Sequence, residues 1–143
     1  MRIAVLFATV ILALFCFLSP ASADNVVPTD RIDPRIDPKM QLLETRSCIG
    51  CNLQNVDLSG EDLRGVNLSR ANLENANLKG AKMMAVVLRD ADLKRADLRQ
   101  ADLLAVDFTG ANLKGAQFSR TDLATARICR TIDPNGKLSQ RDC

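Results

Sequence analysis

The stretch VNLSRANLENANLKG at residues 66–80 decides the fold, because it repeats one five-residue pattern three times. Each unit begins with a small residue, followed by Asn and then Leu, as at residues 71–73. The apolar third residue recurs every five positions from 53 to 128, sixteen times in all, and twelve of these residues are Leu. A period this regular indicates a repeat architecture rather than an ordinary globular core.

Neither an α-helix nor a flat strand can use a period of five. Five residues advance an α-helix by about 500°, so the Leu positions would be spread around its whole circumference. In a flat strand an odd period sends successive Leu side chains to opposite faces. The small residue and the Leu reach a common interior only if the chain turns a corner after each pentapeptide.

The residues between the apolar positions favour such corners. Asn or Asp precedes the central apolar residue in twelve repeats, and its short side chain can bond nearby backbone groups. Five glycines fall two places after the central residue, where a turn needs positive φ: Gly60, Gly65, Gly80, Gly110 and Gly115. Val replaces the usual Ala at 66, 86 and 106, at intervals of twenty. Four pentapeptides therefore complete one square coil.

The tandem Ala-(Asp/Asn)-Leu-x-x pattern resembles the pentapeptide-repeat family. The likeness covers 80 of the 143 residues, from 51 to 130, without an insertion. It implies an all-β fold, a right-handed quadrilateral β-helix of about four coils. It implies little about function, since many members have no assigned role.

The segments on either side of this solenoid are expected to cap it. Residues 40–50 form the N-terminal cap, as one or two helical turns over 40–48 or, alternatively, as an extra strand that extends the five-residue phase backward. Residues 24–39 contain three prolines and a tandem Arg-Ile-Asp-Pro, which predicts an extended or disordered tether. Residues 131–143 form the C-terminal cap, with a turn at Asp-Pro-Asn-Gly 133–136. Two inward positions carry polar residues near the ends, Glu61 and Thr121.

Residues 1–23 have the pattern of a secretory signal peptide. Arg2 precedes a run of 16 residues that is apolar apart from Thr9, and a small-x-small site places cleavage after Ala23. The alternative, an uncleaved membrane anchor, would need roughly 20 apolar residues. We therefore expect an exported protein without a stable membrane anchor after cleavage. The family resemblance implies the periplasm or the thylakoid lumen, as for exported relatives from cyanobacteria and chloroplasts.

Four cysteines remain after cleavage, and an even number in an exported small protein favours disulfides. Cys129 and Cys143 would pin the C-terminal tail. Cys48 and Cys51 have the spacing of a structural disulfide, of a redox-active pair, or of half a metal site. A zinc site would need two more ligands, whereas Cys129 and Cys143 are expected at the far end of the column.

Composition excludes several functions. The chain has no His, and no acid, base and nucleophile set is visible, so we expect no enzyme, cofactor or metal. Removing residues 1–23 takes one of 19 basic residues and none of 17 acidic ones, which leaves a net charge of 18 − 17 = +1. The repeats hold 12 basic and 10 acidic residues. This balance does not suit nucleic-acid binding or the acidic rod of the gyrase-binding relatives that mimic DNA.

Following each outward position up the column defines two surfaces. The first is an apolar ladder, which consists of Met84, Leu104 and Ala124 with Ala85 and Ala105 beside them. The second is a basic edge, which consists of Lys79, Lys94, Arg95, Arg99 and Lys114. We expect the apolar ladder to be the interaction face, because exposed apolar patches mark contact sites.

The sequence thus predicts a non-enzymatic binding or scaffolding module of an extracytoplasmic compartment. Its partner would be a protein, or another copy that associates through the apolar ladder or the solenoid ends. Two alternatives stay open at this point. One is a lumenal thiol–disulfide oxidoreductase that uses Cys48 and Cys51, and the other is a DNA-mimicking gyrase binder.

Overall fold

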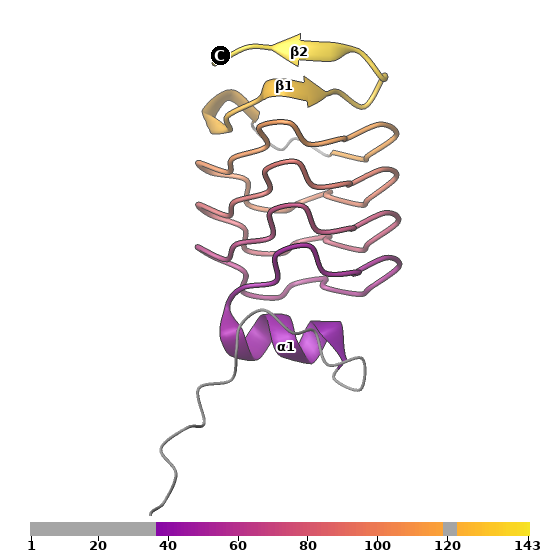
Figure 1. Ribbon diagram of the computed structural model, residues 1–143, viewed down its shortest axis with the longest axis vertical. Coiled ribbons are helices and arrows are strands. Elements are labelled where there is room, and N and C mark those ends of the chain that lie inside the picture. The colour runs from indigo at the N-terminus through magenta and orange to yellow at the C-terminus, as the bar shows by residue number, and fades with distance from the viewer. Residues whose placement is uncertain (1–36, 119–122) are drawn as a thin grey trace, which may run out of the picture. The chain divides into compact units, whose positions relative to one another are not determined.

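The computed structural model describes residues 37–118 and 123–143. The signal peptide expected at 1–23, the first thirteen residues of the expected tether and Thr121 lie outside these ranges. The described residues belong to one compact unit. Its elements are α1 (Pro38–Thr45), η1 (Leu123–Thr125), β1 (Cys129–Ile132) and β2 (Leu138–Gln140), with stacked square coils between α1 and η1 (Figure 1).

The coils are joined by parallel bridges between residues that lie twenty apart. Asn52 bridges Asn72, Asn72 bridges Asp92, and Asp92 bridges Asn112. Such bridges recur every five residues along the chain, so one coil has four sides and twenty residues. The amide of Leu73 donates to the carbonyl of Asp92, which stacks the Leu73 side directly against the Leu93 side. The expected square winding is therefore present.

Each corner is a tight turn closed by one backbone hydrogen bond. At the first corner of this kind the amide of Val56 donates to the carbonyl of Leu53, and Asn55 between them has a φ of 59°. Every fifth residue from 50 to 115 has positive φ, the geometry of a type II turn. The five glycines predicted at this position all adopt it, with φ between 67° and 74°.

The Asn and Asp side chains stabilise these corners as expected. The Oδ1 atom of Asn72 accepts a hydrogen bond from the amide of Glu74 at 3.1 Å, and Asp102 accepts one from Leu104 at 3.2 Å. Eleven such bonds occur, and the accepting side chains are at positions 52, 57, 62, 67, 72, 77, 92, 97, 102, 107 and 112. Between them, Lys82 and Val87 occupy the same position without a carboxamide or carboxylate.

The interior is built from Leu and small residues rather than from aromatic rings. The Leu side chains at 58, 63, 68, 73, 78, 88, 93 and 98 have no exposed surface, and the residue two places earlier is Ala or Val in every case except Leu63, which follows Glu61. Phe108 is the largest fully buried side chain. Because each level repeats the one below it, the burial of identical side chains continues up the column.

The N-terminal cap combines the two forms that the sequence left open. Helix α1 begins at Pro38, two residues before the expected cap, and Asp37 accepts the amide of Lys39 at 2.9 Å as its N-cap. Leu42 of α1 is fully buried against the core. The chain then enters the coil at Ser47, which bridges Asn67, so the stacked coils begin four residues before the expected position 51.

The C-terminal cap is a hairpin, with its turn at the predicted Asp-Pro-Asn-Gly. The Oδ1 atom of Asp133 accepts the amides of Asn135 and Lys137, and β2 pairs antiparallel with β1. The amide of Leu113 donates to the carbonyl of Ile132, so the stacking continues past the expected end at 130. Thr131 is buried, and its hydroxyl donates to the carbonyl of Phe108 at 2.6 Å.

Glu61, at an inward position of the first coil, avoids the interior of the column. Its carboxylate lies 3.0 Å from Nζ of Lys39 in α1, and both side chains keep about a third of their surface exposed, 32% and 31%. A buried carboxylate without a partner would be costly. The polar residue is therefore accommodated by its place at the end, where the cap supplies the opposite charge.

Candidate interaction surface

The apolar ladder lies on one corner of the column and faces solvent. Met84 and Leu104 are 39% and 44% exposed, and Ala85 and Ala105 beside them are exposed too. Ala124 is exposed within η1, where the regular corner gives way to a short 3-10 turn. The regular part of the ladder therefore covers the two levels that contain Met84 and Leu104.

One further residue belongs to this surface and was missed in the sequence. Val87 is half-buried at the position where most repeats place Asn or Asp, and it follows Ala85 and the buried Val86. Val87 has no side-chain acceptor, so the corner that follows it lacks the hydrogen bond to a backbone amide that Asn67 and Asp107 form at the same position. The signal was readable, since Val87 breaks a pattern that holds on the same side at Asn67 and Asp107.

The two alanines of the ladder occupy strained backbone positions. Ala85 and Ala105 have φ values of 57° and 56°. Elsewhere in the described chain, positive φ is adopted by Gly or by polar residues. A left-handed conformation costs an L-residue roughly 1–2 kcal/mol because its Cβ approaches the carbonyl oxygen. The ladder thus places methyl groups at solvent where Gly or Asn would be less strained.

Charged residues border the ladder. Arg64, one level below Met84, donates two side-chain hydrogen bonds to the carboxylate of Asp62, at 2.9 and 2.5 Å. These bonds, with help from the Arg64 amide, hold the pKa of Asp62 well below its usual range. Lys82 and Asp102 lie on the same side as Asp62, one above the other, and both are exposed.

The basic edge, in contrast, is largely neutralised by its own neighbours. Lys94, Arg95 and Lys114 line an open groove of about 420 Å³ together with Glu74 and Gly115. Arg95 forms an ion pair with Glu74, and Nζ of Lys94 lies 2.7 Å from Oδ2 of Asp92. That bond raises the pKa of Lys94. Arg99 likewise pairs with Asp97. Paired cations of this kind provide little net charge for an anionic partner.

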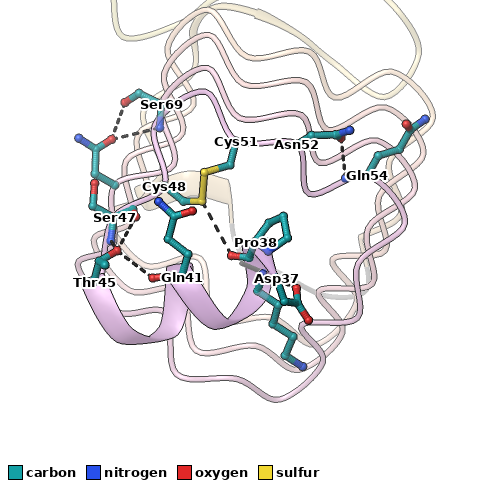
Figure 2. Close-up of a disulfide and its surroundings, with 12 residues drawn as sticks. Asp37, Pro38, Gln41, Thr45, Ser47, Cys48, Cys51, Asn52, Gln54 and Ser69 are labelled. Carbon is teal, nitrogen blue, oxygen red and sulfur yellow. Dashed lines mark hydrogen bonds between the residues drawn. A yellow bond between two sulfur atoms is a disulfide. The ribbon is translucent and has the colours of Figure 1, made fainter. Parts of the chain in front are cut away.

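The structure contains two disulfides, and one of them is the disulfide alternative for Cys48 and Cys51. Cys48 and Cys51 are linked within the interior, where Cys48 takes a central position of the repeat and Cys51 the next small position. They are 1% and 2% exposed, and Pro38 and Gln41 of α1 lie beside them (Figure 2). The second bridge joins Cys129 of β1 to Cys143, which is exposed.

In residues 37–118 and 123–143 no group of three or more acidic, Cys or His side chains is placed to hold a metal ion. Over the same ranges no helix combines the length and apolar character needed to cross a bilayer. A redox-active cysteine must reach its substrate, whereas Cys48 and Cys51 are covered.

Square coils, corner turns and stacked Leu positions define a parallel β-solenoid. The model of a family described as a pentapeptide repeat region matches residues 47–128, more than half of the chain. The chain therefore belongs to the pentapeptide repeat family. Membership implies a right-handed quadrilateral β-helix, and members are generally structural or binding proteins.

Three solved pentapeptide repeat proteins are similar to the chain. HetL from the cyanobacterium Nostoc, described as involved in the regulation of heterocyst differentiation, is 33% identical with a TM-score of 0.64, and the match covers 65% of this chain and 43% of HetL. A protein of the Arabidopsis thaliana thylakoid lumen is 34% identical with a TM-score of 0.41, over 63% and 70% of the two chains. Rfr23 from Cyanothece is 24% identical with a TM-score of 0.46, over 73% and 95%.

The chain thus spans less than half the length of HetL. No curated protein matches it.

Proposed function

We propose that the protein is a non-enzymatic binding module of an extracytoplasmic compartment and that the apolar ladder is its contact surface. One observation carries the proposal: Met84 and Leu104 are exposed on adjacent levels, with Val87, Ala85 and Ala105 beside them. A contiguous apolar surface on a small soluble domain marks an interaction site more often than scattered single residues do. A rigid column presents such a surface without a conformational cost on binding.

Two features support the extracytoplasmic location. Residues 1–23 have the pattern of a signal peptide, and the structure contains two disulfides, which persist in oxidising compartments. Mass spectrometry of the native protein tests this location. We expect the mature chain to begin at Asp24 and to contain no free thiol, whereas a retained N-terminus or four reduced cysteines would contradict export.

Binding is tested by affinity capture from the native exported fraction. The double variant Met84→Glu/Leu104→Glu introduces two charges into the ladder and should abolish capture of the partner. Lys94→Glu/Lys114→Glu is a matched control, because these residues occupy equivalent positions on another corner, also twenty apart. Capture that survives the ladder variant but not the control would move the binding site to the basic edge.

Neither alternative function is favoured by an observation on the described residues. An oxidoreductase that uses Cys48 and Cys51 needs a sulfur within reach of its substrate, but both are buried. We therefore expect no activity in an insulin-reduction assay. A DNA-mimicking gyrase binder needs a strongly acidic rod, but the repeats hold 12 basic and 10 acidic residues. Direct binding to gyrase would overturn that expectation.

A further inference from the structure

The flank of the apolar ladder carries two opposite charges at equivalent positions on adjacent levels. Lys82 and Asp102 bridge each other through their backbones, and Met84 and Leu104 follow them by two residues. Both charged side chains are exposed, and within the described ranges neither has an ion-pair partner within 4.0 Å. Five cations of the coil pair with a nearby carboxylate: Arg64, Arg89, Lys94, Arg95 and Arg99. Arg70 and Asp90 form a similar unpaired couple on another corner, but the couple of Lys82 and Asp102 flanks the apolar ladder.

The surface is complementary to itself in one orientation. A two-fold axis that passes between the two levels, perpendicular to the column, turns a second column upside down against the first. That operation places Met84 of one copy on Leu104 of the other, and it places Lys82 on Asp102. A two-fold interface repeats each contact, so two apolar contacts and two ion pairs form together.

The parallel orientation lacks this match. A two-fold axis along the column brings the Lys82–Asp102 side of one copy against the Val87–Asp107 side of the other. Asp102 would then face Asp107, which already pairs with Arg89, and Lys82 would face Val87, on the levels that they share. Neither ion pair of the antiparallel arrangement can form in this orientation. The charge pattern therefore selects the antiparallel pair.

The backbone edge at the N-terminal end of the column is covered by the cap. The side chain of Lys39 donates to the carbonyl of Asp57 at 2.7 Å, and the guanidinium of Arg46 donates to the carbonyls of Asp62 and Arg64. These carbonyls lie on the edge of the first coil, where an exposed strand would invite pairing with another chain. The cap thus blocks strand pairing at this end, where the large exposed apolar side chains are those of Met40 and Ile49.

We propose that the apolar ladder is the interface of an antiparallel homodimer, with Met84 against Leu104 and Lys82 paired with Asp102 across the two-fold axis. This inference rests on the proposed function, since it names the partner of the ladder. One corner of a small column buries far less than the roughly 800 Å² per partner of a stable interface. The dimer is therefore weak, and the dimeric fraction rises with protein concentration.

Charge reversal provides the decisive test. Lys82→Asp alone sets Asp against Asp102, and Asp102→Lys alone sets Lys against Lys82, so each variant should weaken dimerisation at least about tenfold. An equimolar mixture of the two variants restores both ion pairs, and it should dimerise like the wild type. Sedimentation equilibrium up to millimolar concentration measures all three samples.

Three controls keep this test interpretable. Lys79→Asp makes the same charge change on another corner and should leave the dimer unchanged. Met84→Glu/Leu104→Glu should give monomer at every concentration. Circular dichroism should show that Asp102→Lys folds, because Lys82 already occupies the same position one level below.

Two results would overturn the inference. The first is a wild-type chain that stays monomeric at millimolar concentration, and the second is a mixture of the two charge variants that associates no better than either alone. If affinity capture still depends on Met84 and Leu104 in those cases, only the identity of the partner is wrong. If capture is also unaffected by the ladder variant, the proposed function fails with it.

Discussion

The two ends of the solenoid are closed by different means. At the N-terminus, α1 inserts one side chain, Leu42, beneath the first coil, and the Cys48–Cys51 disulfide lies inside the core. At the C-terminus, β1 continues the backbone ladder, β2 folds back on it, and the Cys129–Cys143 disulfide joins β1 to the end of the chain. The first cap closes the core through burial, and the second closes the edge through backbone pairing.

The ends nevertheless share one device. Arg46 donates to carbonyls on the lower edge of the first coil, and Arg141 donates to the carbonyls of Leu123 and Ala126. Coil edges present unpaired carbonyl groups, and a guanidinium with five donors can satisfy several at once. A solenoid can therefore be capped by quite different folds, provided that a cation satisfies the last carbonyls.

The largest expected effect tests whether the N-terminal cap depends on burial. Leu42→Ala should lower the free energy of unfolding by about 2–5 kcal/mol, since Leu42 is fully buried. Leu138→Ala, on β2, should change it by less than about 0.5 kcal/mol, since Leu138 is 53% exposed. Urea denaturation measures both. Equal losses would remove the contrast between the two caps.

The next effect concerns the disulfides. A mild reductant applied to the native protein should break Cys129–Cys143 first, because Cys143 is exposed and Cys48 and Cys51 are not. Loss of this link should cost about 3 kcal/mol, through the loop entropy of the unfolded chain. Alkylation followed by mass spectrometry identifies the reduced pair. Cys129→Ser/Cys143→Ser is the matched variant, and earlier reduction of Cys48–Cys51 would contradict the burial argument.

A smaller loss of stability is expected when the arginine that bonds the edge carbonyls at either end is removed. Arg46→Ala and Arg141→Ala should each cost about 1 kcal/mol, the net contribution of a hydrogen bond. Lys137→Ala, which removes an exposed cation at a cap, should cost almost nothing. Thermal unfolding separates the three variants. Arg46→Ala should in addition increase aggregation, because it uncovers an edge; a variant as soluble as the wild type would argue against edge protection.

The smallest expected effect is a pH dependence of stability that comes from Asp62, near the N-terminal end of the column. The Arg64 side chain, and more weakly the Arg46 charge, hold the pKa of Asp62 below its value in the unfolded chain. A depressed carboxyl pKa stabilises the fold above about pH 4 and loses this contribution as the pH falls through the folded pKa. Asp62→Asn should therefore reduce the drop in melting temperature between pH 7 and pH 3. An unchanged drop would exclude Asp62 as a source.

The sequence was sufficient for the coil, whereas for the N-terminal cap it predicted helical turns as one alternative and did not locate the start of the helix. The five-residue period sets which side chains share the interior, so corners, glycines and stacking follow from it. Helix α1 begins at Asp37-Pro38, which is a good helix start, but Asp33-Pro34 just before it is the same dipeptide. The two dipeptides differ in how far along the chain they lie from Leu42, whose side chain must reach the core. Which of the two separations fits depends on the dimensions of the folded column.

The candidate surface was predictable in part for a similar reason. The period places Met84 and Leu104 on one corner, which the structure shows as exposed. Val87 was overlooked because it belongs to the next repeat along the chain, although it lies beside the ladder in space. The relation between Lys82 and Asp102 appears only when a second column is placed against the first, and a single chain gives no reason to consider that arrangement.

The twenty-residue coil also limits how the chain can change in length. Inserting one pentapeptide leaves Leu above Leu, but it rotates everything after the insertion by a quarter turn about the column. Placed between Met84 and Leu104, such an insertion would keep the interior filled while carrying Leu104 to another corner. Insertions of twenty residues would instead add one complete coil and leave every later residue on its original corner. Insertions of five and of twenty residues therefore both preserve the interior, but only the insertion of twenty preserves which residues lie together on the surface.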